Sequence, residues 1–312
     1  MSDRQRAAPE AESLPNLPPA VIHVDCDGAT DIYRMHGWRY SQPEDHLFAS
    51  GMRNALEFFQ RNTVRATLFV IASSLDDPRK RALLQDAHLR GHELASHSFS
   101  HPLLYRLTRE EKRHQLADSR EKMEAALGIS VRGFRAPGYS IDQESVELLA
   151  QCGYTYDSSA VPNKIIAGRL NRPLEDFLWP AQPLAGSKFW ELPLPDYRPS
   201  PVPFSPSYAL LLGLPLFRWG LERFSRSGAP LVLLFHFTDL ADPLPASELR
   251  GWKQRIFTLS HLGKESKLRR CQIMLDLVRK HFRIISTDQL LEELNSGRAL
   301  PAPGNRHPAT KA

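Results

Sequence analysis

Residues 21–28 read VIHVDCDG, a short β-branched run that ends in two aspartates and a glycine. The run is typical of a buried strand. Residues i and i+2 share one face of a strand, so Asp25 and Asp27 are expected to point one way and Cys26 the other. Two adjacent carboxylates repel each other, and a cation relieves that repulsion. A plainer interpretation makes them turn or helix-cap residues before Gly28.

Strand-like and helix-like segments alternate along the rest of the chain. The stretch LVLLFHF (231–237) is uniformly apolar, as expected for a strand buried on both faces. The alternation predicts an α/β fold with a parallel sheet and helices outside it. Further strands are expected at 65–72, 92–98, 131–138, 155–159 and 282–287, and helices at 47–62, 77–91, 108–128, 142–153, 264–281 and 288–297.

Two later segments break this pattern. Residues 162–206 are rich in proline, and we expect them to be irregular, with at most a short hairpin, and to belong to the rim of a site. Residues 208–226 mix apolar side chains with arginines. They predict a core-packing amphipathic helix interrupted by Pro215, and the alternative is a surface that rests on a bilayer with anionic headgroups.

The length alone suggests two domains, but α/β barrels of this size often form one, and the composition is that of a globular chain. The chain has 312 residues, of which 42% are hydrophobic, enough for a large core. We place the domain at residues 20–298, between a disordered lead-in (1–19) and a flexible tail (299–312). The net charge of +5 is scattered over the chain and forms no basic stripe with interleaved aromatics, so a nucleic-acid partner is not expected.

The cysteines and the N-terminal residues bear on location. Cys26, Cys152 and Cys271 are odd in number and have no metal-like spacing, which fits a reducing compartment. The first 19 residues contain no apolar signal-peptide core, and the chain has no uncharged apolar run of about 18 residues. We therefore expect a cytoplasmic protein, with peripheral contact to the inner membrane face as an extension of that expectation.

Two histidines follow the third expected strand. His97 and His101 are four residues apart, but Pro102 disfavours a helix there, so they are expected to converge through a loop. Two imidazoles and one carboxylate form a ligand set that suits Zn²⁺ and leaves positions open for water. We choose Asp27 as the third ligand. Asp25 then remains free to act as a general base. Both histidines also fit an interpretation as ordinary loop residues.

Two more polar residues lie at the ends of expected strands. His236 stands inside the apolar run 231–237 and is either a satisfied core histidine or an acid that protonates a leaving amine. Arg135 is either a structural ion-pair partner or the group that keeps Asp25 ionised. Parallel strands place functional residues at their carboxyl ends, so these side chains are expected to gather at one edge.

These motifs, in this order, resemble the polysaccharide deacetylase family with the NodB homology domain, carbohydrate esterase family 4, in its non-secreted branch. The resemblance covers roughly residues 19–294. It rests on HVDCDG (23–28), HSFSH (97–101), RAPGY (135–139) and LLFHF (233–237).

The resemblance implies a distorted, incomplete (β/α)7 barrel and a role for each motif. Asp25 would be the catalytic base, Arg135 its partner and His236 the general acid. A divalent metal, expected to be Zn²⁺, would bind Asp27, His97 and His101.

One motif of the family, an aspartate and a tryptophan that support the acid histidine, has no clear copy here. Asp157, Trp190 and Glu191 lie in the right region. We assign Trp190 and Glu191 to substrate binding, together with Tyr139, near which a backbone N–H would stabilise the oxyanion.

The predicted function is a metal-dependent hydrolase that removes an acetyl or formyl group from an amino sugar. The substrate would be a carbohydrate or glycolipid, lipid-linked or a polysaccharide precursor. One alternative is an amidohydrolase acting on a small cyclic amide or ureide. The other is a non-catalytic carbohydrate-binding relative.

Overall fold

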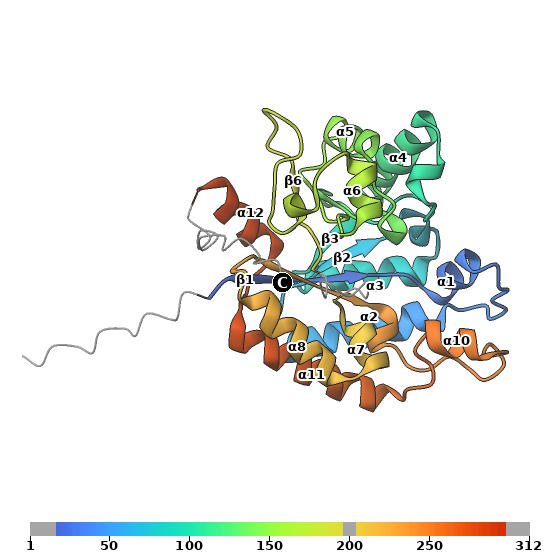
Figure 1. Cartoon of the computed structure of the whole chain (residues 1–312). Coiled ribbons are helices and arrows are strands. Elements are labelled where there is room, and N and C mark those ends of the chain that lie inside the picture. The colour runs from blue at the N-terminus through green and yellow to red at the C-terminus, as the bar shows by residue number, and fades with distance from the viewer. Residues whose placement is uncertain (1–16, 196–203, 298–312) are drawn as a thin grey trace, which may run out of the picture.

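The computed structural model describes residues 17–195 and 204–297, which form one parallel sheet surrounded by helices (Figure 1). The strand order is β6-β5-β4-β3-β2-β1-β7, and the short β8 pairs with the start of β1. The strands are β1 (Pro19–Asp25), β2 (Thr67–Val70), β3 (Glu93–Ser96), β4 (Gly133–Phe134), β5 (Tyr156–Asp157), β6 (Trp190–Glu191), β7 (Leu231–His236) and β8 (Arg283–Ile284).

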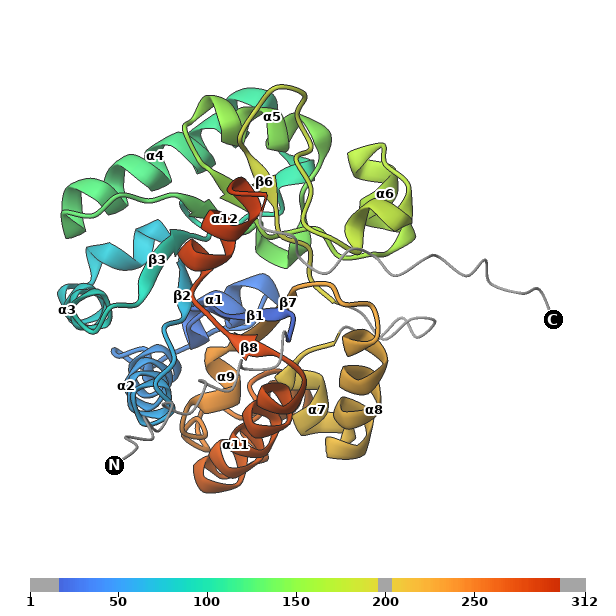
Figure 2. The ribbon, with the colours of Figure 1, turned by 90° about the vertical axis from the view of Figure 1, so that its left-hand side faces the viewer.

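Helices connect successive strands and lie around the sheet, as Figure 2 shows from the end where the strands begin. The α-helices are α1 (Ala29–Met35), α2 (His46–Arg61), α3 (Pro78–Leu89), α4 (Arg109–Leu127), α5 (Gln143–Gln151), α6 (Lys164–Leu170), α7 (Pro206–Leu212), α8 (Leu214–Ser225), α9 (Phe237–Leu240), α10 (Trp252–Phe257), α11 (Lys264–His281) and α12 (Thr287–Asn295).

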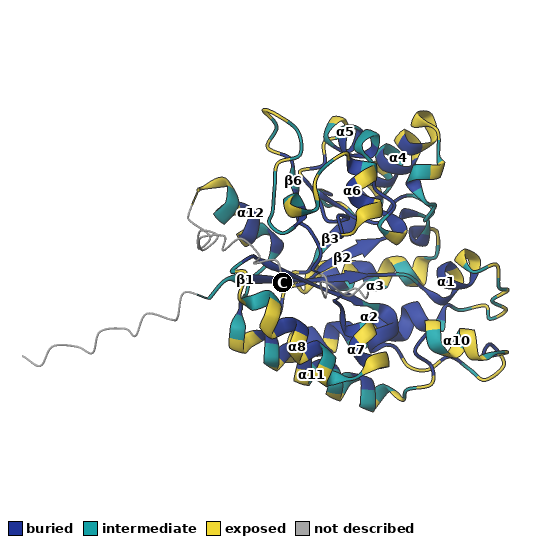
Figure 3. Cartoon of the chain, in the orientation of Figure 1, coloured by how far each residue is buried: buried dark blue, intermediate teal, exposed yellow. Residues whose placement is uncertain are grey.

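The sheet confirms the expected incomplete barrel. All strand pairings between named strands are parallel, and β6 and β7 at the two ends of the order do not pair with each other. Burial explains the arrangement, because β1, β2 and most of β7 are buried along their whole length. The dark blue interior of Figure 3 follows the sheet and the inner faces of the helices. A strand with both faces covered is uniformly apolar, as the sequence of β7 is.

Several helix ends were predicted correctly from residues close to them in the sequence. Thr108 caps α4 in a capping box with Glu111, and Gly128 ends that helix in the left-handed conformation. Pro78 opens α3 behind the capping carboxylate of Asp77. Such ends depend on neighbours three or four residues away, so the sequence alone reveals them.

The described part of the segment 162–206 matches the expectation in part. It is mostly irregular, and one antiparallel bridge joins Ala181 to Glu191, as in a short hairpin. It also contains α6, and its strand β6 runs parallel to β5, which we did not expect. The helix expected at 208–226 is two helices, and the break lies at Gly213 (φ 104°), while Pro215 lies in the first turn of α8. A proline in a first helical turn loses no hydrogen bond, which explains why it does not interrupt the helix.

The domain boundaries stay a prediction, because most of the lead-in and the tail lie outside the described residues. Within residues 17–195 and 204–297, no helix is both long enough and apolar enough to cross a membrane.

Candidate active site

Strand register gathers the polar residues at the carboxyl end of the sheet. Asp25 of β1 pairs with His236 of β7. The backbone N–H of His97 donates to Val70 of β2 (2.8 Å), and that of Arg135 donates to Ser96 of β3 (2.9 Å). These motif residues therefore lie at or directly after the carboxyl ends of their strands, at one level of the sheet. Parallel strands make this edge the usual place for a site.

Asp27, His97 and His101 meet there. One ligand atom from each lies within 4.8 Å of the others. Asp27 Oδ1 is 3.2 Å from His101 Nε2 and 3.7 Å from His97 Nε2. The residues between the histidines form a loop, as expected, with Ser98 (φ 67°) and His101 (φ 67°) both in the left-handed conformation. This loop brings the centroids of the two imidazole rings to within 5.0 Å of each other.

Hydrogen bonds orient these imidazoles. Nδ1 of His97 is 2.8 Å from the carbonyl oxygen of Arg135, which can only accept, so Nδ1 carries the proton and Nε2 is left with its lone pair. The backbone N–H of His101 donates to the hydroxyl of Ser98 (2.9 Å).

Burial and neighbouring charges shift the pKa values of Asp27, His97 and His101 in different directions. Burial would raise the pKa of Asp27, but the charge of His101 and then that of His97 outweigh burial and lower that pKa well below its usual value. Burial lowers the pKa of His97, so its ring is neutral. Burial would also lower the pKa of His101, but the charge of Asp27 prevails and raises it.

The residues fit a divalent metal. Asp27 Oδ1 and His101 Nε2 are buried and have no hydrogen-bond partner in the described part of the chain. Unsatisfied buried polar atoms that face one another are costly unless something binds them. An N2O set with three protein ligands is that of a catalytic zinc site. Cys26 contributes no ligand to this group, and its thiol lies 3.7 Å from the carbonyl of Val24.

Asp25 lies between this group and two other motif residues. It is only 3% exposed. Its Oδ1 is 3.4 Å from Nε of the fully buried Arg135, and its Oδ2 is 3.7 Å from Nε2 of His236 and 4.0 Å from Nε2 of His97. The carboxylate is therefore held by a guanidinium on one side and faces the acid candidate on the other.

His236 is oriented by a pair of residues that the sequence did not suggest. Its Nδ1 lies 3.1 Å from the hydroxyl of Ser207, which donates to Asp239 Oδ1 at 2.7 Å. Asp239 Oδ2 accepts from the backbone N–H of His236 (2.9 Å). Since the Ser207 proton goes to the carboxylate, the hydroxyl oxygen accepts from Nδ1–H. This contact at Nδ1 leaves Nε2 of His236 facing Asp25, at 3.7 Å from its Oδ2.

Replacing Ser207 by alanine is expected to lower kcat about tenfold at unchanged KM, because His236 loses the partner that fixes its ring. Ser207→Thr, which keeps the hydroxyl, should restore most of the rate. Steady-state kinetics together with zinc affinity check this. A fall in zinc affinity in Ser207→Ala would contradict it, since Ser207 contacts none of the three candidate ligands.

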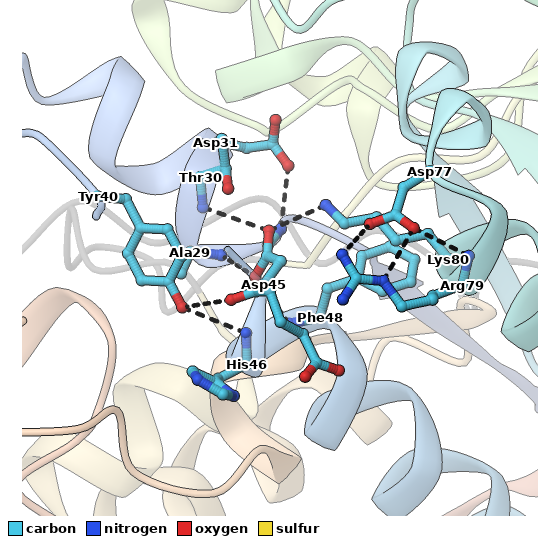
Figure 4. Close-up of polar contacts among 12 residues, drawn as sticks. Ala29, Thr30, Asp31, Tyr40, Asp45, His46, Phe48, Asp77, Arg79 and Lys80 are labelled. Atoms are coloured by element: carbon cyan, nitrogen blue, oxygen red, sulfur yellow. Dashed lines mark hydrogen bonds and ion pairs between the residues drawn. The ribbon is translucent and has the colours of Figure 1, made fainter. Parts of the chain in front are cut away.

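Asp45 supports the loop that carries Asp27 (Figure 4). Its carboxylate accepts from the N–H groups of Ala29 (2.8 Å) and Phe48 (3.1 Å), at the starts of α1 and α2, and pairs with Lys80 (2.9 Å). A Cβ on Gly28 would lie 2.0 Å from Asp45 Oδ2. The glycine of HVDCDG is therefore needed for this close approach.

Replacing Asp45 by alanine should lower the free energy of unfolding by about 3 kcal/mol, through two lost helix caps and a cation left without its partner. Urea unfolding measures this. Asp77→Ala is the matched control, because Asp77 caps α3 alone (Arg79 N–H, 2.9 Å), and its loss should amount to about 1 kcal/mol. Equal losses in both variants would refute the double role of Asp45.

Tyr139 lies near the site, but its own backbone N–H is not free for an oxyanion. That N–H donates to the carbonyl of Ala136 at 3.0 Å, closing a tight turn. The expected N–H for the oxyanion would therefore belong to another residue near Tyr139, and it stays a prediction. Burial, then the charge of Asp25, raises the pKa of the Tyr139 phenol, which stays a neutral hydroxyl donor.

The described contacts of Trp190 and Glu191 are with other parts of the chain, and their assignment to substrate binding stays a prediction. Trp190 Nε1 donates to Asn295 of α12 (3.0 Å). Glu191 is 4% exposed and accepts from the N–H of Ala160 (2.9 Å). Glu191 lies beside Asp157 in register, and burial raises the pKa of both carboxyls. Neither of these acids makes a described contact with His236, so Ser207 and Asp239 fill the place we had sought at Asp157, Trp190 or Glu191.

Comparison with known proteins bears on residues 44–156, which match the family model "Polysaccharide deacetylase". The chain is 32% identical over 101 residues to chitin deacetylase 1 of Cryptococcus neoformans, and 28% identical over 144 residues to a peptidoglycan deacetylase of Helicobacter pylori. These matches cover 32% and 43% of this chain, and they span only 21% and 48% of the two relatives.

Solved structures share the fold over nearly the whole chain. A polysaccharide deacetylase structure from Mycobacterium smegmatis matches with a TM-score of 0.62 at 20% identity, covering 95% of this chain and 96% of that one. An allantoinase structure matches with a TM-score of 0.61 at 13% identity, covering 95% and 98%. Both likenesses concern the fold alone. Residues 44–156, about a third of the chain, are thus similar to the polysaccharide deacetylase family, and the two curated relatives they resemble are deacetylases.

Proposed function

We propose that this protein is a hydrolase that removes an N-acyl group, acetyl or formyl, from an amino sugar. The observation that carries the proposal is the position of Asp25, whose Oδ2 lies 4.0 Å from Nε2 of His97, a member of the Asp27–His97–His101 group, and 3.7 Å from Nε2 of His236. Amide hydrolysis needs a base for the attacking water and an acid for the leaving amine at such a spacing.

Asp25 acts as the base. The guanidinium of Arg135 lies 3.4 Å from the carboxylate of Asp25 and orients it, and the carboxylate takes the proton as water attacks the acyl carbonyl. His236, held through Nδ1 by Ser207, gives a proton from Nε2 to the leaving nitrogen. Tyr139 would bind substrate, and its phenol, whose pKa is raised by burial, would stay a neutral hydrogen-bond donor.

Asp27, His97 and His101 would hold the metal, for which we propose Zn²⁺. A divalent metal in such a site polarises the carbonyl and makes water more acidic. The protein holds Asp27 ionised and His97 neutral for that purpose, through the charges and the burial described above. Asp25 is outside the ligand group and keeps its carboxylate for proton transfer.

A panel assay tests the function. The full chain, stripped of metal and reloaded with Zn²⁺, is given N-acetylglucosamine oligomers, peptidoglycan fragments, N-formyl amino sugars and allantoin. Released acetate or formate is measured for the sugars, and allantoate formed by ring opening is measured for allantoin. Acid released from an amino sugar supports the proposal. Hydrolysis of allantoin alone would establish the cyclic-amide alternative, and sugar binding with no turnover would establish a non-catalytic relative.

We also propose that the amino sugar is carried by a lipid and presented at an anionic bilayer. Exposed apolar side chains gather on α7 and α8, among them Leu212 (57% exposed) and Trp219 (44% exposed). Arg218, Arg223 and Arg226 are exposed at the same helices, which gives the surface a charge that complements anionic headgroups. Ser207 ties α7 to His236, so this surface begins beside the site.

Vesicle co-sedimentation tests the surface. Binding to vesicles containing phosphatidylglycerol, and its loss in Leu212→Glu, supports the proposal. Leu89→Glu, on the exposed face of α3, is the control and should bind as the parent does. No binding to anionic vesicles would end the membrane proposal and leave the deacylation proposal intact.

We propose a cytoplasmic location, at the inner membrane face. The three cysteines, Cys26, Cys152 and Cys271, are free thiols, as in proteins of a reducing compartment. Cell fractionation tests this location.

A further inference from the structure

A line of buried polar side chains runs from Asp25 through the inside of the barrel. Arg135 Nη2 lies 2.6 Å from Nδ1 of His23, and Nε2 of His23 lies 3.1 Å from the hydroxyl of Thr287. That hydroxyl is 2.8 Å from the hydroxyl of Thr67, which donates to Glu93 Oε2 at 2.9 Å. His23, Thr67, Thr287 and Arg135 are each at most 2% exposed.

In this hydrogen-bonded chain of side chains, each group donates to the next one along, from Arg135 to Glu93. A guanidinium only donates, so Nδ1 of His23 must accept and carries no proton. A neutral imidazole then has its proton on Nε2 and donates to Thr287. The Thr67 proton goes to the Glu93 carboxylate, so the bond between the two threonines is donated by Thr287. The chain begins at a cation and ends at an acid, and such ordered bonds polarise one another.

The far end of this row of hydrogen-bonded side chains lies at the opposite mouth of the barrel. Glu93, Thr67 and Thr287 border a hollow there that also contains Arg132, whose guanidinium lies 3.5 Å from Glu93 Oε1. Thr287 is the first residue of α12, which lies across the end of the barrel where the strands begin (Figure 2). The C-terminal helix thus supplies one link of a chain that reaches the candidate base.

The guanidinium depends on this chain for its position. Among described residues, Nε and Nη1 of Arg135 have no hydrogen-bond partner, and Nη2 has two, His23 and Ser158 (2.9 Å). The ring of Phe69 lies 4.4 Å from the guanidinium carbon and limits its movement on one face. An acceptor at Nδ1 of His23 therefore decides which way Nε points, and Nε points at Asp25.

We infer that His23, Thr287 and Thr67 are positioning residues that hold Arg135 against Asp25, so that α12 takes part in setting the activity of a site at the other end of the barrel. The inference rests on the proposed role of Asp25 as the base. Burial, then the charge of Arg135, lowers the pKa of His23, which agrees with the neutral ring that the chain requires.

Two substitutions at His23 separate the two halves of the chain. In His23→Asn the amide oxygen replaces Nδ1 and keeps an acceptor for Arg135, and in His23→Gln the amide replaces Nε2 and keeps only the contact to Thr287. We expect kcat to fall about 10- to 30-fold in His23→Gln, as for the loss of one hydrogen bond to a charged group, and less than about threefold in His23→Asn, with KM unchanged in both. Equal kcat values in the two variants would overturn the inference.

Thr287 tests the contribution of α12. Thr287→Val should lower kcat about threefold, and Thr287→Ser should restore it, because one neutral hydrogen bond is lost and regained. Thr258→Val is the matched control: Thr258 is as buried as Thr287 and bonds Gln254 and Ser260. It should lower the melting temperature at unchanged kcat. A wild-type kcat in Thr287→Val would overturn the role of α12.

One measurement needs no substrate and so keeps this inference apart from the proposed function. In proton–nitrogen NMR spectra of protein with ¹⁵N-labelled histidine, His23 is expected as the neutral tautomer with its proton on Nε2. In Thr287→Val that ring proton should exchange faster with water. A proton on Nδ1 of His23 would overturn the chain even in an active enzyme. The expected tautomer in a protein without deacylase activity would leave the chain intact and refute the function.

Discussion

Replacing Asp25 by asparagine is expected to lower kcat by about 10³-fold and to leave zinc affinity unchanged. Asparagine has the same shape but cannot take the proton of the attacking water. Zinc affinity is preserved because Asp25 is outside the group formed by Asp27, His97 and His101. Acid release from the best substrate of the panel and calorimetric titration with Zn²⁺ measure the two quantities.

Stability has to be controlled in that experiment, because Asp25→Asn also removes the anion that faces the buried Arg135. Asp142→Asn is the matched control. Asp142 pairs with the buried Lys112 (2.6 Å) and caps α5, and the described hydrogen bonds of its carboxylate go to Lys112 and Ser145 and to no residue of the candidate site. Asp142→Asn should lower the melting temperature and keep the wild-type kcat. Normal turnover by Asp25→Asn would refute its role as the base.

The candidate ligands were predictable because their signals are local. The i, i+2 spacing of Asp25 and Asp27 puts both on one face, and Pro102 rules out a helix at His101. The alternation of strands and helices then predicts that residues following parallel strands meet at one edge. The register confirms this for Asp25 and His236, which pair directly across β1 and β7.

The support of His236 was not predictable, because it comes from chain that is distant in sequence. Ser207 lies 29 residues before His236, directly after the segment 162–206 that we expected to be irregular, and no motif marks it. Asp239 had a signal, since an acid three residues after a strand end is typical of a helix N-terminus. Our search at Asp157, Trp190 and Glu191 followed the resemblance, whereas the contacts of this chain lead to α7.

The parallel strand β6 was missed for a related reason. It has only two residues, and its pairing with β5 is supplied by tertiary contacts across more than 30 residues of chain. A two-residue strand has no periodicity from which to predict it. The same limit applies to His23, whose partners Thr67, Thr287 and Arg135 come from three different parts of the chain.

Removing one ligand imidazole is expected to have the second large effect. His101→Ala should lower zinc affinity by about 100-fold or more and abolish turnover at limiting metal. His114→Ala is the control, since His114 is an exposed histidine that also pairs with a carboxylate, Asp118, but lies on α4. It should bind zinc as the parent does. Unchanged affinity in His101→Ala would contradict the proposed ligand set.

The pH dependence of zinc binding identifies the ligand that must lose a proton. In the metal-free protein the pKa of His101 is raised above 6.5 by Asp27, so below that raised pKa a proton competes with the metal. His97 has a lowered pKa and Asp27 stays ionised to well below pH 4, so neither takes up a proton near neutrality. Zinc affinity should therefore fall about tenfold per pH unit as the pH drops below the raised pKa, with one proton released per zinc bound. Because the competing proton resides on His101, zinc affinity in His101→Ala should be lower and nearly independent of pH in that range. A slope that persists in His101→Ala would assign the proton to another ligand.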